Sequence, residues 1–213
     1  MTAAGIFDEL ARVKAPRQAR SRRAFAAALD AFDDLLRERP LAAVSVQEVA
    51  DRAGLSITSV YARFDGKSAL VLALHERVIA AGVGRLDDAV GDRALAGEPV
   101  AAVVAEVIGR AVDFADAHAH VFRAVLAAAD HETNRRAAAF VRAGSERLAR
   151  LLGPGVDEHD VDFAWRAAVA VLQQRWVLWG AEPSRFPPGR DELVRRLTRA
   201  FVAAVAPDDG GRP

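Results

Sequence analysis

The sequence predicts an all-α protein of nine helices, with an N-terminal three-helix head followed by a larger helical body. Apolar residues recur at spacings of three and four along most of the chain. No stretch alternates as a strand does, and clusters of glycine and proline separate the periodic segments. With 213 residues and 52% hydrophobic content, the chain can bury a sizeable core in one or two domains.

The helix boundaries follow from caps and breakers. The first helix carries an apolar stripe that begins at Phe25 and Leu29, and Pro40 closes it. The segment from Gly153 to Gly155 ends the seventh. The nine predicted helices span about residues 17–37, 46–53, 57–64, 67–84, 99–118, 121–129, 134–152, 157–179 and 190–205.

Residues 44 to 70 are the most informative part of the chain. Ser45 stands three residues before Glu48, which is the spacing of a capping box at the start of a helix. Gly54 suits a sharp turn after that helix, and Ser56 is a suitable N-cap for the next one. Two short helices joined by a glycine turn form the layout of a helix-turn-helix, whose second helix enters the DNA major groove.

The outer side of the second short helix favours DNA binding. Thr58 and Ser59 are small and polar, and Arg63 adds a cation that can bind guanine or phosphate. Similar helix pairs occur in proteins that never bind DNA, but their exposed faces are usually richer in glutamate. A basic run before the unit, which includes Arg20, either lies along phosphates or forms a solvated arm. The candidate DNA-binding residues are Ser45, Ser56, Thr58, Ser59, Tyr61, Arg63, Lys67 and Arg20.

Residues 17 to 75 resemble the TetR family of bacterial transcriptional regulators. The matching features include Ala53-Gly54-Leu55-Ser56, Val60-Tyr61-x-x-Phe64 and Lys67-x-x-Leu70. The resemblance implies that Ser45 and Tyr61 contact phosphate, that Thr58 and Ser59 lie at the groove, and that Lys67 holds the DNA backbone. It departs at Ile57 and Ala62, where the family often has larger or more polar residues. The domains we expect are a flexible basic arm (1–16), a DNA-binding domain (17–66), a ligand-binding and dimerisation domain (67–206) and a disordered tail (207–213).

Composition excludes several other classes of protein. The formal net charge is zero, no run of eighteen apolar residues lacks a charge, and no apolar signal core opens the chain. We therefore expect a cytoplasmic protein without a membrane partner. The absence of cysteine excludes disulfides and thiolate sites, and the five histidines are scattered, so neither a metal nor another cofactor is expected.

The body of the chain carries candidate ligand-binding residues. All three tryptophans fall on one face of the helix predicted at 157–179, which indicates either core packing or the wall of an apolar pocket. His118 is either a core histidine or a polar anchor in that pocket. The candidates for binding a small apolar effector are Phe114, His118, Phe122, Phe140, Trp165, Leu172, Gln173 and Trp176.

The last helix presents Leu193, Leu197 and Phe201 on one broad apolar side. The family resemblance implies that the last two helices pair with their copies in a homodimer; the alternative is that they only cover the core of the subunit. We expect a ligand-responsive repressor that binds an inverted-repeat operator in double-stranded DNA, and no enzymatic activity. An all-helical enzyme and a structural adaptor are the other classes; the first lacks a catalytic constellation and the second leaves the polar helix unexplained.

Overall fold

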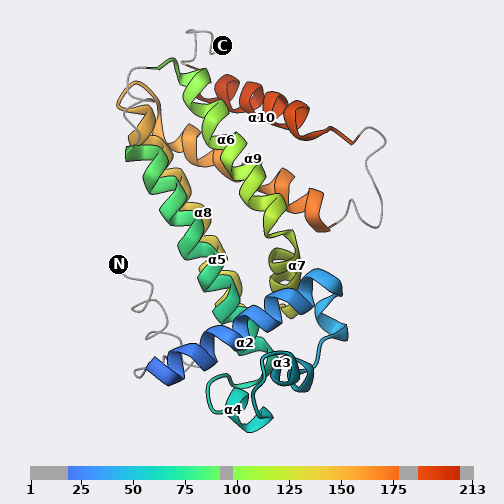
Figure 1. Ribbon diagram of the computed structural model, residues 1–213. Helices are drawn as coiled ribbons and strands as arrows, with labels where there is room; N and C mark the ends of the chain where they lie inside the picture. Colours follow the sequence, from blue (N-terminus) through green and yellow to red (C-terminus); the bar gives the residue numbers. More distant parts are fainter. Residues whose placement is uncertain (1–18, 92–97, 178–186, 207–213) are drawn as a thin grey trace. The chain divides into compact units, whose positions relative to one another are not determined.

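The computed structural model describes residues 19–91, 98–177 and 187–206 (Figure 1). Within these ranges the chain forms nine α-helices, one 3₁₀ turn and no strand, which confirms the predicted fold class. The elements are α2 (Ala19–Glu38), η1 (Leu41–Ala43), α3 (Val46–Arg52), α4 (Ile57–Tyr61), α5 (Gly66–Gly91), α6 (Val100–Ala117), α7 (Ala119–Ala128), α8 (His131–Leu152), α9 (Glu158–Val177) and α10 (Arg190–Val205).

The helices group into two compact units. The first unit comprises residues 1–81 and 118–136, and the second comprises residues 82–117 and 137–213. Helices α5 and α8 therefore each contribute to both units. The predicted functional boundary at 66/67 remains a prediction, and the predicted arm and tail lie outside the described residues. No helix in the described ranges is long and apolar enough to cross a membrane.

Two helices end elsewhere than the sequence indicates. The fourth predicted helix was to end near Gly84, but α5 continues to Gly91. Glycine weakens a helix without ending it when packing favours the continuation. At Gly82 the packing requires glycine, because a Cβ there would lie 2.8 Å from Cζ of Phe114. By contrast, α4 is shorter than predicted, because it ends at Tyr61 and not at Phe64.

The junction between α7 and α8 depends on local capping. Ala129 ends α7 in the left-handed conformation at φ 48°, which is unusual for a residue other than glycine. The Asp130 carboxylate then accepts hydrogen bonds from the backbone N–H and the hydroxyl of Thr133, at 3.0 and 2.9 Å. This cap lets α8 begin at His131, earlier than the predicted start at residue 134.

The core of the first unit includes the predicted stripe of α2, because Phe25, Leu29, Phe32 and Leu36 are all buried. A polar contact joins the same helix to α7, where Nε2 of His120 and Oδ1 of Asp33 lie 2.7 Å apart. Burial raises the pKa of Asp33, but the hydrogen bonds and charges of His120 and Arg37 outweigh it and lower that pKa from 3.8 to about 2.

The Asp33 contact predicts a pH-dependent contribution to stability. Because the folded-state pKa lies below the ordinary value, the stabilisation is fully present above about pH 4 and is lost as the pH falls towards 2. We expect Asp33→Asn to lower the free energy of unfolding by about 2 kcal/mol at pH 6 and much less near pH 2.5. Urea unfolding at both pH values measures this difference, and Asp34→Asn, at an exposed neighbour, serves as the control. An equal effect of Asp33→Asn at the two pH values would contradict the assignment.

In the second unit, α10 packs along α6 and α9. Ion pairs support this packing: Arg190 Nε lies 2.7 Å from Asp113, and Arg175 Nε lies 3.2 Å from Asp116. Both acids belong to α6, so the start of α10 and the end of α9 are each tied to that helix.

Candidate nucleic-acid interface

The predicted capping box at the start of α3 is present. The Ser45 hydroxyl accepts a hydrogen bond from the Glu48 backbone N–H at 3.2 Å, and the Glu48 carboxylate accepts one from the Ser45 backbone N–H at 2.9 Å. Arg39 adds an ion pair to Glu48 at 2.8 Å. These contacts, with the Ser45 side chain first, lower the pKa of Glu48 and fix the first turn of α3. Ser45 is exposed, where a phosphate can reach it.

The turn between α3 and α4 has the predicted geometry. Gly54 adopts a positive φ of 64°, a conformation that glycine tolerates without strain. Ser56 caps α4 by accepting a hydrogen bond from the Ser59 backbone N–H at 3.1 Å. Of the residues of α4 only Val60 is buried, and just beyond the helix the Phe64 ring packs on Phe25 of α2 with the centroids 4.8 Å apart.

This packing directs the polar side of α4 towards solvent. Thr58 is exposed, Ser59 is half-buried, and Tyr61 has 52% of its surface exposed. An exposed aromatic residue beside small hydroxyl side chains is compatible with contacts to phosphates and base edges. The structure thus brings the predicted groove residues together on one short helix.

Arg63 lies in the turn after α4, not on the helix as predicted. Its guanidinium folds back, and Nη1 donates to the carbonyl and the hydroxyl of Ser59 at 2.6 and 2.8 Å. Nη2 lies 3.5 Å from the Ser21 hydroxyl of α2, and Nε is buried without a partner. The side chain therefore joins α2 to α4, and it would have to turn outward to contact a base.

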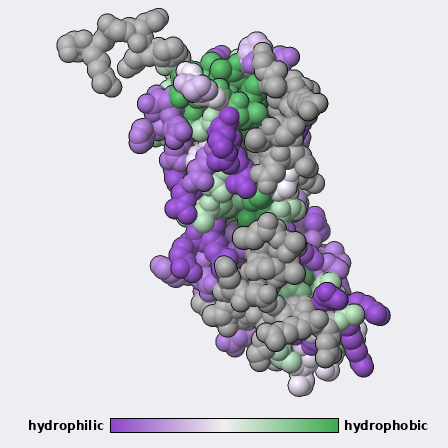
Figure 2. Space-filling model, turned by 90° about the vertical axis from the view of Figure 1, so that its left-hand side faces the viewer, coloured by the Kyte–Doolittle hydropathy of each residue, from purple (hydrophilic) through white to green (hydrophobic). Residues whose placement is uncertain are grey.

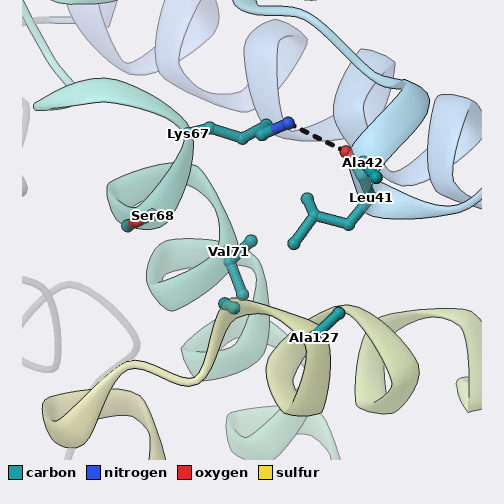
Figure 3. Close-up of a pocket in the computed structure, with 7 residues that line it drawn as sticks. Leu41, Ala42, Lys67, Ser68, Val71 and Ala127 are labelled. Atoms are coloured by element: carbon teal, nitrogen blue, oxygen red, sulfur yellow. Dashed lines mark hydrogen bonds between the residues drawn. The ribbon is translucent and has the colours of Figure 1, made fainter.

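Lys67 is the best-anchored cation of the set. Its Nζ donates to the backbone carbonyl of Leu41 at 2.9 Å (Figure 3). It also donates to the carbonyl of Val44 at 2.9 Å, and the two bonds tie the start of α5 to η1 and the residue that follows it. The side chain borders a pocket of about 280 Å³ that Val71 and Ala127 also line. Two of the three ammonium donors are thus used within the protein, and the phosphate contact implied for Lys67 stays a prediction.

Three arginines without an ion pair in the described chain lie at the start of α2. Arg20, Arg22 and Arg23 are exposed, the first turn holds no acid, and none of the three forms an ion pair with the described residues. By contrast, Arg37 and Arg52, at or beyond the other end of the helix, pair with Asp33 and Glu38. Because Ser21 contacts Arg63, the start of α2 lies near the end of α4. The rest of the basic run, residues 12–17, lies outside the described residues.

The predicted ligand-binding residues divide between the two units. Phe114 and Phe140 lie in the second unit with ring centroids 6.4 Å apart. There Trp165 is buried and its indole N–H donates to the Val141 carbonyl at 3.0 Å. Leu172 is also buried, whereas Gln173 is exposed, and the side chain of Trp176 lies outside the described residues. His118 and Phe122 are half-buried in the first unit. The effector site stays a prediction.

The predicted dimer residues have a role within the subunit. Leu193, Leu197 and Phe201 are 3%, 8% and 2% exposed, on the side of α10 that packs against α6 and α9. Their apolar periodicity is explained by this packing, which was the alternative reading of the stripe. A partner subunit would have to displace α6 or α9 to reach them.

Sequence reasoning missed two features. The Asp33–His120 contact joins residues far apart in the chain, and no local pattern indicates it. Phe163 is 71% exposed on α9. Its sequence signal was present, because Phe163 falls off the apolar stripe of that helix.

Comparison with known proteins matches the N-terminal part of the chain to one family. Residues 28–74 match the family model described as bacterial regulatory proteins, tetR family, and no curated protein matches the chain. A tetR-family transcriptional regulator from Streptomyces coelicolor is 26% identical, with a TM-score of 0.65 over 87% of this chain and 79% of that one.

Two further solved structures share the fold at lower identity. A TetR/AcrR-family regulator from Thermobifida fusca is 17% identical, with a TM-score of 0.61 over 92% of this chain and all of that one. FadR from Bacillus subtilis, solved in complex with stearoyl-CoA, is 14% identical, with a TM-score of 0.59 over 85% of this chain and 98% of that one.

The Lys67 contacts predict a structural effect that is separable from DNA binding. Lys67→Met should lower the free energy of unfolding by about 2 kcal/mol, because the carbonyls of Leu41 and Val44 lose charge-assisted donors. Arg23→Met, which removes an exposed cation without an ion pair in the described chain, should leave stability within about 0.5 kcal/mol. Urea unfolding tests both variants, and an unchanged midpoint for Lys67→Met would show that the tie contributes nothing.

The capped helix-turn-helix lies within residues 28–74, which match the model of bacterial regulatory proteins of the tetR family, and the described chain shares its fold with a regulator of that family.

Proposed function

We propose that the protein is a homodimeric repressor that reads an inverted-repeat operator and releases it when a small apolar effector binds. The observation that carries this proposal is α4, whose buried Val60 leaves Thr58, Ser59 and Tyr61 facing outward from a capped head. Two such heads, held about one turn of DNA apart, would read the two halves of a palindrome. A regulator of this kind acts in the cytoplasm.

In the proposed complex, some residues of the head position it on the DNA and others recognise the base sequence. Ser45 and Tyr61, exposed at either side of the unit, contact phosphates and set its register on DNA. Thr58 and Ser59 approach base edges, and Arg63 joins them only after releasing Ser59. The exposed guanidinium groups of Arg20 and its neighbours contribute a part of the affinity for DNA that decreases as the salt concentration rises, because each phosphate contact releases counterions.

The body responds to the effector through a difference in affinity between two conformations, and the effector shifts the equilibrium by no more than that difference. We assign the DNA-binding domain to residues 17–66 and the effector and dimer domain to residues 67–206. The buried aromatic residues of the second unit, together with Trp176, favour an uncharged or weakly polar molecule. FadR, a protein of the same fold, is solved with stearoyl-CoA, whose acyl chain is apolar but whose CoA moiety is anionic, so only the acyl part resembles the effector proposed for this chain.

The operator is the first test. Selection from random-sequence DNA should yield an inverted repeat, and Thr58→Val should reduce affinity for it by about 1–3 kcal/mol while relaxing preference at one position in each half. Arg20→Ala should weaken selected and random DNA alike and reduce the salt dependence of binding. The matched control is Gln47→Ala, on the exposed side of α3. If Thr58→Val and Gln47→Ala behave alike, α4 is not the helix that reads the operator.

The effector is the second test. Uncharged apolar compounds should quench tryptophan fluorescence and dissociate the protein from its operator, whereas strongly anionic metabolites should not. Trp176→Ala should reduce this response at least about tenfold and leave operator affinity unchanged, because about 1.4 kcal/mol of lost contact corresponds to one decade. Gln174→Ala, at an exposed position two residues away, is the control. Release by charged metabolites alone would contradict the assigned pocket.

A further inference from the structure

A groove of about 650 Å³ runs between α6 and α10 within the second unit and is open to solvent. Arg190 at the start of α10 pairs with Asp113 near the end of α6. The groove brings Val202, near the end of α10, together with Ala101 at the start of α6, so the two helices run in opposite directions. On α10 the lining falls within residues 194–206, which span about 18 Å at a rise of ~1.5 Å per residue. The groove is therefore long enough for an extended chain of atoms to lie between the two helices.

Much of the wall of this groove is apolar. Ala101 and Ala105 line it from α6, and Val202, Ala203 and Ala206 line it from the last turns of α10. Each of these five residues is exposed or half-buried, so their side chains offer apolar surface to an occupant. Figure 2 shows that apolar side chains also reach the surface of this protein in patches among hydrophilic ones. An apolar molecule in the groove would remove such surface from water, which favours binding.

Two arginines one helical turn apart border the groove. Arg195 and Arg199 are exposed, and neither forms an ion pair with a described acid, although Arg190 and Arg196 of the same helix do. No acidic residue is among those that line the groove. Like charges four residues apart on a helix repel each other unless an anion lies close by. The groove is thus cationic at these two residues and apolar beyond them, and it suits an occupant with an anionic head and an apolar chain.

The lining also includes a hydroxyl group without a partner. Oγ1 of Thr198, a residue that lies between the two arginines in the sequence, is buried and has no hydrogen-bond partner. A buried hydroxyl group of this kind destabilises the protein until it finds a partner. A rotation about the Cα–Cβ bond of Thr198 would turn the hydroxyl towards the groove without breaking a hydrogen bond. The hydroxyl could then donate to an anion that the arginines hold.

We propose that the groove between α6 and α10 binds the anion of a single-chain fatty acid. The carboxylate lies between Arg195 and Arg199, whose guanidinium groups each offer paired N–H donors, and Thr198 donates a further hydrogen bond. The alkyl chain lies along Val202 and Ala206, between the two walls. None of the residues predicted for the effector pocket lines this groove, so the site is separate from the proposed effector site and the inference goes beyond the proposed function.

Calorimetry with sodium decanoate, at concentrations below those at which it forms micelles, tests the binding. The wild-type chain should bind one decanoate per subunit, and its melting temperature should rise with the decanoate concentration. Affinity should increase about threefold with each methylene from octanoate to dodecanoate, because each one extends the apolar contact. Octanol lacks the charge and butanoate lacks most of the chain, and each should bind at least about tenfold more weakly than octanoate.

Reversing the charge of the groove should reverse its preference for the head group. Arg195→Glu/Arg199→Glu should lose decanoate binding and gain binding of decyltrimethylammonium, which the wild type should not bind. The matched control is Arg123→Glu/Arg150→Glu, which changes two other exposed arginines without an ion pair in the described chain and should keep the wild-type preference. Circular dichroism checks that both double variants fold.

The apolar part of the site has its own pair of variants. Val202→Asp puts a carboxylate beside the alkyl chain and should weaken decanoate binding at least about tenfold, because the charge would lose water when the chain binds. Ala200→Asp, at an exposed position of the same helix that does not line the groove, should leave decanoate affinity unchanged.

Four results would overturn the inference. The first is a folded wild type that does not bind decanoate, and the second is decanoate binding that survives either Arg195→Glu/Arg199→Glu or Val202→Asp. The third is a wild-type dimer that Val202→Asp converts to monomers, since a second copy would then fill the groove. In the fourth, phosphatidylglycerol vesicles co-sediment with the protein while free decanoate does not bind, so that the groove would face a lipid surface. Selection of the operator is independent of all four results, so the DNA-binding proposal is tested separately.

Discussion

The packing of Phe64 on Phe25 is the contact on which the presentation of α4 depends. A helix as short as Ile57–Tyr61 does not form by itself, since nucleation costs more than a few backbone hydrogen bonds return. Its stability comes from Val60 and Phe64, both buried in the head, and from the Ser56 cap. Because those apolar residues face inward, the hydroxyl-bearing residues of α4 face outward, and the surface proposed to read DNA is a consequence of core packing.

The elements that the sequence predicts well are those with local causes. The capping box of Ser45, the positive φ of Gly54 and the stripe that starts at Phe25 follow from spacing alone, and the structure contains all three. Elements that depend on distant packing were harder to predict. The stripe with Leu197 predicts a buried face of α10 correctly, but the pattern cannot distinguish a neighbouring helix of the same subunit from one of another copy.

DNA contacts that were predicted from residue type alone are limited in the same way, because the type does not show which partners a side chain finds within the protein. Arg63 and Lys67 both have the charge expected of a DNA contact, and both hydrogen-bond to the protein's own chain. Their partners, Ser59 for one and the carbonyls of η1 for the other, are fixed by how α2, η1 and α5 meet. An arginine with a planar array of donors can hydrogen-bond within the protein and still exchange that partner for a phosphate or guanine, because all of these partners offer hydrogen-bond acceptors.

Net charge conceals how the cations are distributed. The chain is formally neutral, and most described arginines on α6, α8 and α9 form ion pairs with acids of their own subunit. Among the arginines without an ion pair in the described chain are three at the start of α2 and Arg195 and Arg199 on α10. Exposed pairs contribute little to stability but do neutralise potential, so the unpaired groups dominate the field felt by an approaching anion. In the proposed repressor the cluster at the start of α2 faces DNA. Salt weakens the contacts of these arginines with phosphates, so the salt dependence of operator binding reports how many phosphate contacts the head makes.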